Sequence, residues 1–187
     1  DLLRLVRAIG AVRRLIRRER IQLVFSTGGY IAAPAILAAR WCGVPVVLQD
    51  FPQVTGVPMS VPTIERVIEG CPQVVCFKHE DCPGLAKLGA IRAATGRGEL
   101  PRMSILTGNG GGLFLPEELL RGADGAMTGF AYPEMMVDVV AAHQAGQTER
   151  AFDVFDAYLP LARYEQQPNI GLAVRKHILK ERGVIAS

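Results

Sequence analysis

Apolar and polar residues along the chain fall into short alternating blocks that predict strands and helices in turn. Between residues 21 and 128, compact apolar runs are separated by segments with helical spacing. The predicted strands are 21–26, 45–49, 73–78, 103–107 and 125–128. The predicted helices are 32–42, 61–69, 84–94, 116–122, 133–144, 148–163 and 169–182. Repeated strand–helix units of this kind are typical of a parallel sheet with right-handed crossovers.

Five predicted strands define the fold class as α/β but leave two architectures open. They are too few to close an eight-stranded barrel and enough for an open sheet. We therefore expect five parallel strands, arranged as half of a (βα)8 barrel or as a flavodoxin-like open sheet, followed by C-terminal helices. A chain of 187 residues with 49% hydrophobic content supports one ordinary core, so we expect a single α/β domain over 1–187.

The net charge of +3 hides a strong asymmetry between the first 20 residues and the rest. That segment holds seven arginines against two acidic residues, so it carries +5 and the remainder carries −2. Its apolar residues recur at helical spacing, which predicts a basic amphipathic helix. Such a helix can lie on anionic lipid or nucleic acid, but no aromatic residues interleave with the arginines. We expect a solvated face on a helix that covers the sheet, with neither nucleic acid nor a membrane as partner.

Other compositional signals narrow the class further. The apolar runs are too short to cross a bilayer, and the chain does not open with a signal-peptide layout, so we expect a cytoplasmic protein. The four cysteines form no C-x-x-C pair, so we expect reduced packing residues and neither a metal site nor a disulfide framework.

Lys78 is the candidate catalytic residue, because it ends the apolar run 74–77 and a turn follows at once. In α/β folds, chemistry belongs at the carboxyl ends of the strands. An amine in an apolar strand end is poorly solvated, which lowers its pKa and lets it attack a ketone to form a Schiff base. The alternative is that Lys78 extends from the strand end into water.

The other strand ends supply polar and glycine-rich turns. His79 beside Glu80 suggests acid–base chemistry, but adjacent strand residues point in opposite directions, so we expect a supporting or salt-bridge role. Two glycine-rich turns could cradle phosphate at helix N-termini, although neither matches a Walker loop or the G-x-G-x-x-G fingerprint. They are Gly28-Gly29-Tyr30 and the turn that contains Gly108 and Asn109.

From about residue 46 to residue 187 the chain resembles the C-terminal half of the dihydrodipicolinate synthase and N-acetylneuraminate lyase superfamily of (βα)8 barrels. The blocks that carry the resemblance are 49–52 with 55–57, 75–78, 106–108, 122–128 and 169–176. The ending 183–187 is most similar to the branch that acts on 2-keto-3-deoxy sugar acids. The resemblance implies a lyase or dehydratase of 2-keto acids such as pyruvate, with no cofactor. It implies Lys78 as the Schiff-base nucleophile, and substrate contacts from Gln49, Thr107, Gly108, Asn109, Thr128 and Gly129.

Residues 1–45 resemble a different family, the N-terminal domain of the peptidoglycan GlcNAc transferase that makes lipid II. The runs 13–18, 21–34, 38–40 and 43–45 carry this likeness. It implies that Gly28, Gly29 and Tyr30 form a loop for a phosphate group or a lipid-linked acceptor. The likeness stops at 49–52, where the transferases have a His-Glu-x-Asn segment. We therefore expect a chimera, natural or engineered, with its seam inside the strand at 44–48.

The chimera leaves three hypotheses for function. The first is an impaired Schiff-base lyase or dehydratase. The half of the barrel that carries the carboxylate-binding turn is missing, and the strand ends in Gln49 where the family has a proton-relaying tyrosine. The second is a catalytically silent recombined α/β protein. The third is a nucleotide-sugar or lipid-binding remnant of the transferase. An incomplete barrel exposes strand edges, so we also expect a homo-oligomer.

Overall fold

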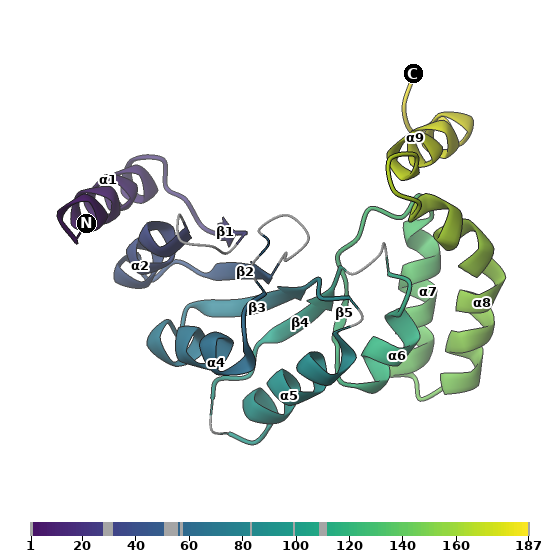
Figure 1. The fold of residues 1–187 in the computed structure, drawn as a ribbon, viewed down its shortest axis with the longest axis horizontal. Coiled ribbons are helices and arrows are strands. Elements are labelled where there is room, and N and C mark those ends of the chain that lie inside the picture. The colour runs from purple at the N-terminus through teal and green to yellow at the C-terminus, as the bar shows by residue number, and fades with distance from the viewer. Residues whose placement is uncertain are drawn as a thin grey trace. The chain divides into compact units, whose positions relative to one another are not determined.

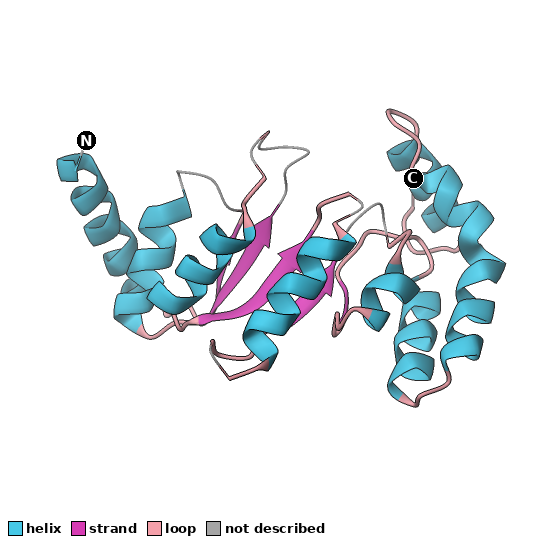
Figure 2. Ribbon diagram, turned by 60° about the horizontal axis from the view of Figure 1, so that its bottom comes forward, coloured by secondary structure: helices cyan, strands magenta, loops and turns pink. Residues whose placement is uncertain are grey.

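The computed structural model describes residues 2–27, 32–50, 56, 58–82, 84–98, 100–108 and 112–186 (Figures 1 and 2). Parallel strands alternate with helices, as the sequence pattern predicts. The strands are β1 (Val24–Ser26), β2 (Val46–Asp50), β3 (Val74–His79), β4 (Ser104–Thr107) and β5 (Gly125–Ala126). The helices are α1 (Leu2–Arg18), α2 (Ala33–Cys42), α4 (Val61–Gly70), α5 (Leu85–Gly96), α6 (Leu115–Leu120), α7 (Pro133–Gln144), α8 (Thr148–Glu165) and α9 (Gly171–Glu181).

The strand order decides between the two architectures that the sequence left open. Each strand lies next to its neighbour in sequence, in the order β1-β2-β3-β4-β5. A flavodoxin-like sheet would reverse direction after its first strand pair, giving the order 2-1-3-4-5. Sequential order is the winding of a (βα)8 barrel, so the sheet corresponds to part of a barrel. The contacts between residues divide the chain into two compact units, Asp1–Leu106 and Thr107–Ser187.

The first unit is built around β2, all five residues of which are buried. β1 pairs with it in parallel, with Val24 opposite Val46 and Ser26 opposite Leu48. The transferase-like strand and the first strand of the aldolase-like segment are thus neighbours in one sheet, as the chimera hypothesis requires. The core is completed by apolar side chains from strands and helices, including Ala38, Ile64, Ile68, Phe77, Leu88 and Ile91.

Local signals set the helix ends in this unit. Gly43 follows α2 in the left-handed conformation at φ 67°, and its N–H bonds to the carbonyls of the last turn. Ser60 precedes α4 and its side chain accepts a hydrogen bond of 3.4 Å from the N–H of Thr63. The glycine and serine at these positions explain why both helix ends are close to their predicted positions.

The pairing of β2 with β3 contains an irregularity that matters for the site. Val46 lies opposite Val74, but Val47 lies opposite Cys76, so Val75 is left over as a bulge and is exposed. A bulge shifts the register by one residue along the rest of the ladder. Beyond it, Gln49 therefore lies opposite Lys78, and Asp50 lies opposite His79.

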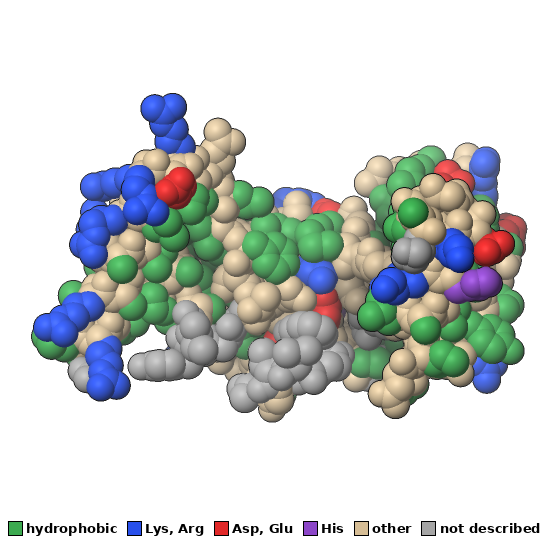
Figure 3. All heavy atoms as spheres, turned by 90° about the horizontal axis from the view of Figure 1, so that it is seen from above, with side chains coloured by type: hydrophobic (Ala, Val, Ile, Leu, Met, Phe, Trp, Pro, Cys, Tyr) green, Lys and Arg blue, Asp and Glu red, His purple; other side chains and the backbone are tan. Residues whose placement is uncertain are grey.

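Helix α1 confirms the predicted basic amphipathic helix at the N-terminus. Its buried positions are Ile9 and Ile16, and it packs against α2, where Arg13 stacks over the ring of Trp41 at 5.2 Å. Lys and Arg side chains gather over this part of the molecule in Figure 3. In the part of the chain that the structure describes, α1 and the other helices all fall short of the length and apolarity that a bilayer-spanning helix needs.

The second unit is mainly helical. α7 packs against α8, and Met135 and Val139 of α7 and Phe155 of α8 are buried. The rings of Phe130, Tyr132 and Tyr158 form a continuous aromatic cluster. Arg182, just after α9, lies over the ring of Tyr132 at 4.2 Å and hydrogen-bonds to the Ala131 carbonyl. These contacts fix α9 to the segment that follows β5.

Candidate functional site

Lys78 and Gln49 meet at the carboxyl ends of β3 and β2, and a third residue joins them. The ammonium of Lys78 forms an ion pair with Oε1 of Glu80. The side-chain amide of Gln49 donates a hydrogen bond of 2.8 Å to that same oxygen. The side chains of Lys78 and Glu80 are 16% and 8% exposed, so the cluster is largely removed from water.

This geometry settles the placement of the lysine. The Lys78 side chain does not extend into solvent, because most of its surface is buried against protein. Lys78 and Glu80 are two residues apart, so they share one face at the strand end, and Gln49 reaches the same face from β2 through the register of the sheet. A primary amine and a side-chain amide are thereby both held within hydrogen-bonding distance of one carboxylate oxygen.

The opposite face carries a second charged cluster. Lys87 of α5 donates a hydrogen bond of 2.8 Å to Oδ2 of Asp50 and pairs with Asp81. Burial alone would lower the pKa of Lys87, but the hydrogen bonds that its ammonium donates to Asp50 and Asp81 outweigh burial and raise that pKa. This triad ties the ends of β2 and β3 to the helix that follows them.

His79 belongs to this opposite face and points away from the amine. Its ring is fully buried beside Phe77, with centroids 5.8 Å apart, and its Nε2–H donates to the carbonyl of Gly84 at 3.0 Å. Burial lowers the pKa of the imidazole, so the neutral form is favoured. Gly84 has φ 52°, and a Cβ there would collide with the His79 ring. The expected alternation of Lys78 and His79 is confirmed, and His79 fixes the turn after β3.

In the second unit, Thr107 ends β4 and its hydroxyl donates to the carboxylate of Glu118 in α6. Both residues are fully buried. Burial raises the pKa of Glu118 to about 7, and the nearby Glu117 carboxylate adds to the shift, although the Thr107 hydrogen bond opposes it. Glu118 Oε1 has no hydrogen-bond partner among the described residues. The substrate contact predicted for Thr107 therefore competes with an internal bond that the sequence did not indicate.

The remaining predicted substrate contacts follow β4 and β5. Thr128 has a buried hydroxyl without a hydrogen-bond partner in the described part of the chain. Gly129 is exposed, and a Cβ on it would collide with the guanidinium of Arg175, which Glu165 holds at 2.9 Å. Gly108 follows Thr107 directly. Asn109 and the loop residues Gly28, Gly29 and Tyr30 lie outside the described residues.

Sequence reasoning proposed Lys78 as the candidate catalytic residue but did not assign a carboxylate partner to it. The spacing of Lys78 and Glu80 was the available signal, since residues two apart on a strand share a face. Glu118 carried no comparable signal, because its contact with Thr107 depends on how the chain folds between the two residues. Among the described residues, no group of three or more His, Cys, Asp or Glu side chains is arranged to hold a metal ion.

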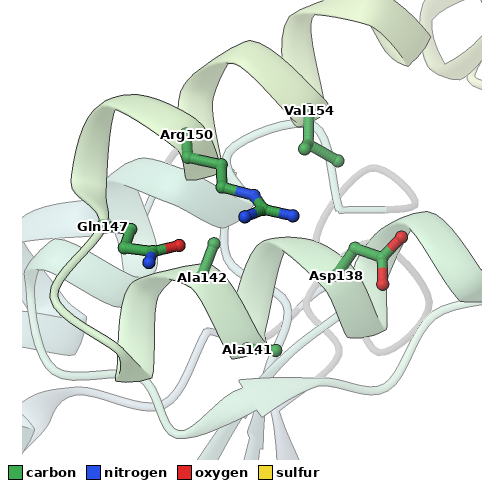
Figure 4. Close-up of a pocket in the computed structure, with 6 residues that line it drawn as sticks. All are labelled: Asp138, Ala141, Ala142, Gln147, Arg150 and Val154. Carbon is green, nitrogen blue, oxygen red and sulfur yellow. The ribbon is translucent and has the colours of Figure 1, made fainter.

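A pocket between α7 and α8 is lined by other residues than those of the predicted site (Figure 4). In this view the Arg150 guanidinium points over Ala142 into the space between the two helices. The lining residues are Asp138, Ala141, Ala142, Gln147, Arg150 and Val154. None of them belongs to the predicted site.

Two family models match the chain, and they overlap. The model described as the dihydrodipicolinate synthetase family matches residues 31–187, and the model described as the glycosyltransferase family 28 N-terminal domain matches residues 1–56. The predicted seam at 44–48 lies inside the shared stretch 31–56. The sequence is thus a composite of the two families, as predicted.

Two curated relatives of the chain are transferases of one kind. The UDP-N-acetylglucosamine–N-acetylmuramyl-(pentapeptide) pyrophosphoryl-undecaprenol N-acetylglucosamine transferase of Synechococcus sp. (strain CC9311) is 66% identical over 56 residues, which is 30% of this chain and 16% of the relative. The transferase of Prochlorococcus marinus (strain MIT 9303) is 40% identical over 150 residues, or 58% of this chain and 42% of the relative. The chain spans less than half the length of these transferases.

Solved structures reflect the fold of the whole chain. A dihydrodipicolinate synthase from Rhodopseudomonas palustris is 37% identical with a TM-score of 0.75, and the alignment covers 98% of this chain and 72% of that one. A prophage protein of the dihydrodipicolinic acid synthase family from E. coli K12, solved in complex with pyruvate, has a TM-score of 0.63 at 17% identity, covering 94% of this chain and 70% of that one. The second likeness shows the fold alone.

Proposed function

The chain belongs to the dihydrodipicolinate synthetase family, and on that premise we propose that it is a Schiff-base-forming lyase or dehydratase of 2-keto acids with Lys78 as the nucleophile. The observation that carries the proposal is the position of the Lys78 amine. It lies at the carboxyl end of a central strand, is largely buried, and is paired with a carboxylate. Chemistry in sequentially wound β/α sheets is placed at this end of the strands.

A Schiff base requires a substrate with a keto group, and its product is an electron sink. The amine adds to the keto carbon and water leaves, which gives a protonated imine that can stabilise negative charge on the adjacent carbon. A bond to that carbon can then be broken, as in retro-aldol cleavage or dehydration. The pyruvate bound to the E. coli relative is a compound of this class. We therefore propose a small 2-keto acid, pyruvate or a keto-deoxy sugar acid, as substrate.

Trapping the imine tests the proposal directly. Borohydride reduction in the presence of pyruvate should add one substrate-derived mass to the protein, and peptide mapping should place it on Lys78. Lys78→Arg keeps the charge but cannot form the imine at neutral pH, so it should give no adduct. Lys176→Arg, at an exposed position in α9, is the matched control and should react as the wild type does. An unmodified Lys78 peptide in the wild-type protein would refute the proposal and favour a catalytically silent chimera.

We propose that the activity is low compared with a complete family member. The strand that ends in a tyrosine in the resembled enzymes ends here in Gln49, and an amide cannot transfer a proton as a phenol can. Poor orientation of substrate would add to this loss, because positioning contributes about 7 kcal/mol or more in a good site. Comparison of turnover with a full-length family member on pyruvate-derived substrates is the test, and equal turnover would contradict the proposal.

The match of residues 1–56 to the glycosyltransferase domain supports a second candidate, binding of a nucleotide sugar or a lipid-linked acceptor. The loop Gly28, Gly29 and Tyr30 is the segment that would make this contact. Calorimetric titration with UDP-GlcNAc tests the nucleotide-sugar form, and the absence of a saturable signal would eliminate it.

We propose that this chain associates with copies of itself. β1 is at one edge of the sheet, and the apolar side chains of Leu23, just before this strand, and Phe25, within it, are 52% and 48% exposed. An exposed strand edge with apolar side chains favours pairing with a second copy. Sedimentation at micromolar concentration should give the mass of a homo-oligomer, and a monomer mass would contradict this.

A further inference from the structure

We propose that Glu80 is a catalytic residue, the acid–base partner that takes the proton from the Lys78 ammonium and returns it when water leaves the carbinolamine. This inference rests on the proposed Schiff-base function and deepens it by assigning the proton transfers to one side chain. It also assigns Gln49 as a positioning residue that orients Glu80.

Contact geometry is the first support. Oε1 of Glu80 is paired with Nζ of Lys78 and also accepts the 2.8 Å hydrogen bond from Nε2 of Gln49. Glu80 is 6% exposed, so the carboxylate exchanges protons with bulk water less readily than a surface carboxylate does. A general base must lie within hydrogen-bonding reach of the proton it removes, and Glu80 meets that requirement for the amine itself.

Chemical need is the second support. Only a neutral amine can attack a carbonyl, so an ammonium that is ion-paired with a carboxylate, as Lys78 is, must first give up a proton. Gln49 cannot accept that proton, because an amide does not titrate in this range. The carboxylate of Glu80 is of the right chemical type and is already in contact.

The neighbouring titratable groups make their contacts with other residues, although Nδ1 of His79 has no hydrogen-bond partner among the described residues. The His79 Nε2–H is used on the carbonyl of Gly84, on the face opposite Lys78. Asp50 and Asp81 are both paired with Lys87. Among the described residues at the ends of β2 and β3, the contacts therefore single out Glu80 as the titratable group that reaches the amine.

The protons balance over the steps of imine formation. Lys78 transfers one proton to Glu80, and the free amine attacks the keto carbon to form the C–N bond. The electron pair of the C=O π bond moves to oxygen, which takes a proton from the nitrogen to give a neutral carbinolamine. Glu80 then donates its proton to the hydroxyl, the C–O bond breaks, and water leaves. The products are the protonated imine and ionised Glu80, so no external acid, base or redox reagent is consumed.

Gln49 has a defined part in this scheme. Its donated hydrogen bond holds Oε1 in place whether or not the amine has become an imine. Because it acts through Glu80, Gln49 is expected to influence the rate of imine formation without contacting the reacting carbon.

The test measures the rate of imine trapping by pyruvate and cyanoborohydride in the purified chain. Glu80→Gln keeps the size and hydrogen-bonding shape of the side chain, and it should slow trapping about 100-fold or more, the usual contribution of a general acid–base group. Glu80→Ala should be similarly slow and should be accelerated about tenfold or more by added formate, which supplies the missing carboxylate. A purely structural role would give no formate rescue. Glu69→Gln, an exposed charge-matched control in α4, should react as the wild type does with or without formate.

The outcomes separate this inference from the proposed function. If the wild-type protein gives no Lys78 adduct, the proposed function fails and this inference fails with it. If the wild type is trapped and Glu80→Gln is trapped at the same rate, the proposed function stands and the role of Glu80 is refuted.

Folding of the variants is checked by circular dichroism. Should both variants be unfolded, Glu80→Asp retains the charge with a shorter reach, and it should be slowed at least about tenfold with formate rescue. An unchanged, formate-insensitive rate in Glu80→Asp would refute the inference.

Discussion

Gln49 donates its side-chain hydrogen bond to the Glu80 oxygen that also pairs with Lys78. The two residues are 31 positions apart in the chain and meet because β2 and β3 are neighbours with a shifted register. Without the bulge at Val75, continuous pairing from Val46 and Val74 would place Asp50 opposite Lys78. A carboxylate would then stand where the neutral amide now stands.

Gln49→Leu removes this amide while keeping a side chain of similar size. A buried hydrogen bond to a charged group contributes about 1.5–3 kcal/mol, so we expect stability to fall within that range. We also expect imine trapping to slow, because Glu80 loses its orienting contact. Urea unfolding and the trapping assay measure the two effects. Gln22→Leu, at an exposed position before β1, is the control, and a Gln49→Leu protein as stable as this control would contradict the expectation.

Lys87→Met leaves two carboxylates without their shared cation. Asp50 is 1% exposed and its Oδ2 receives the 2.8 Å bond from Lys87, so removal of the lysine leaves a buried charge uncompensated. Breaking a buried ion pair from one side costs about 3–5 kcal/mol. Chemical denaturation should show a loss of this size, whereas Lys176→Met at an exposed position should change little. A loss below about 1 kcal/mol would mean that the triad behaves as a surface pair.

Glu118 should make stability depend on pH in a defined direction. The ordinary carboxyl pKa is 4.5, and burial raises the pKa of Glu118 to about 7. Between these values the folded state holds a proton that the unfolded state has released, so stability falls as pH rises through this window and stays low above it. The interval corresponds to a free-energy difference of about 3 kcal/mol.

Glu118→Gln cannot ionise and should lack this dependence. The difference in the free energy of unfolding between the variant and the wild type should therefore be larger at pH 8 than at pH 5, in favour of the variant, by up to about 3 kcal/mol. Urea unfolding at the two pH values measures it. Glu149→Gln, exposed at the start of α8, should follow the wild type at both pH values. A constant difference between Glu118→Gln and the wild type at the two pH values would show that Glu118 has an ordinary pKa.

Gly171→Ala should disrupt the start of α9. A Cβ at this position would collide with the backbone carbonyl oxygen of Glu165, and backbone cannot move aside as a flexible side chain can. We expect a loss of about 2 kcal/mol in a thermal or urea unfolding measurement. Gly89→Ala in α5 is the matched control, because nothing lies within 4 Å of its Cβ. The control should be stabilised by about 0.5–1 kcal/mol, the helix preference of alanine over glycine. Equal effects at the two positions would rule out the collision.

Particular residues explain where prediction from sequence succeeded in the fold. The strand 73–78 was recognisable because its apolar side chains are buried in a parallel sheet, and the structure gives Val74–His79. The predicted strand 125–128 shrinks to Gly125–Ala126, since a single bond from Met127 to Thr107 follows it where a ladder would be needed. Strand order was not predictable, because a pattern of apolar positions does not specify which edges pair.

By itself, the sequence determined the alternation of strands and helices, the composite of two families, and a lysine at the end of a buried strand. These follow from local patterns, since burial of a strand and the turn after it are encoded in adjacent residues. Only the tertiary structure decided what stands beside that lysine. A one-residue bulge in β3 sets the register of two strands, and register determines that Gln49 and Glu80 share the face of Lys78, while His79, Asp50 and Lys87 occupy the other. Register depends on pairing between distant segments, so no local pattern contains it.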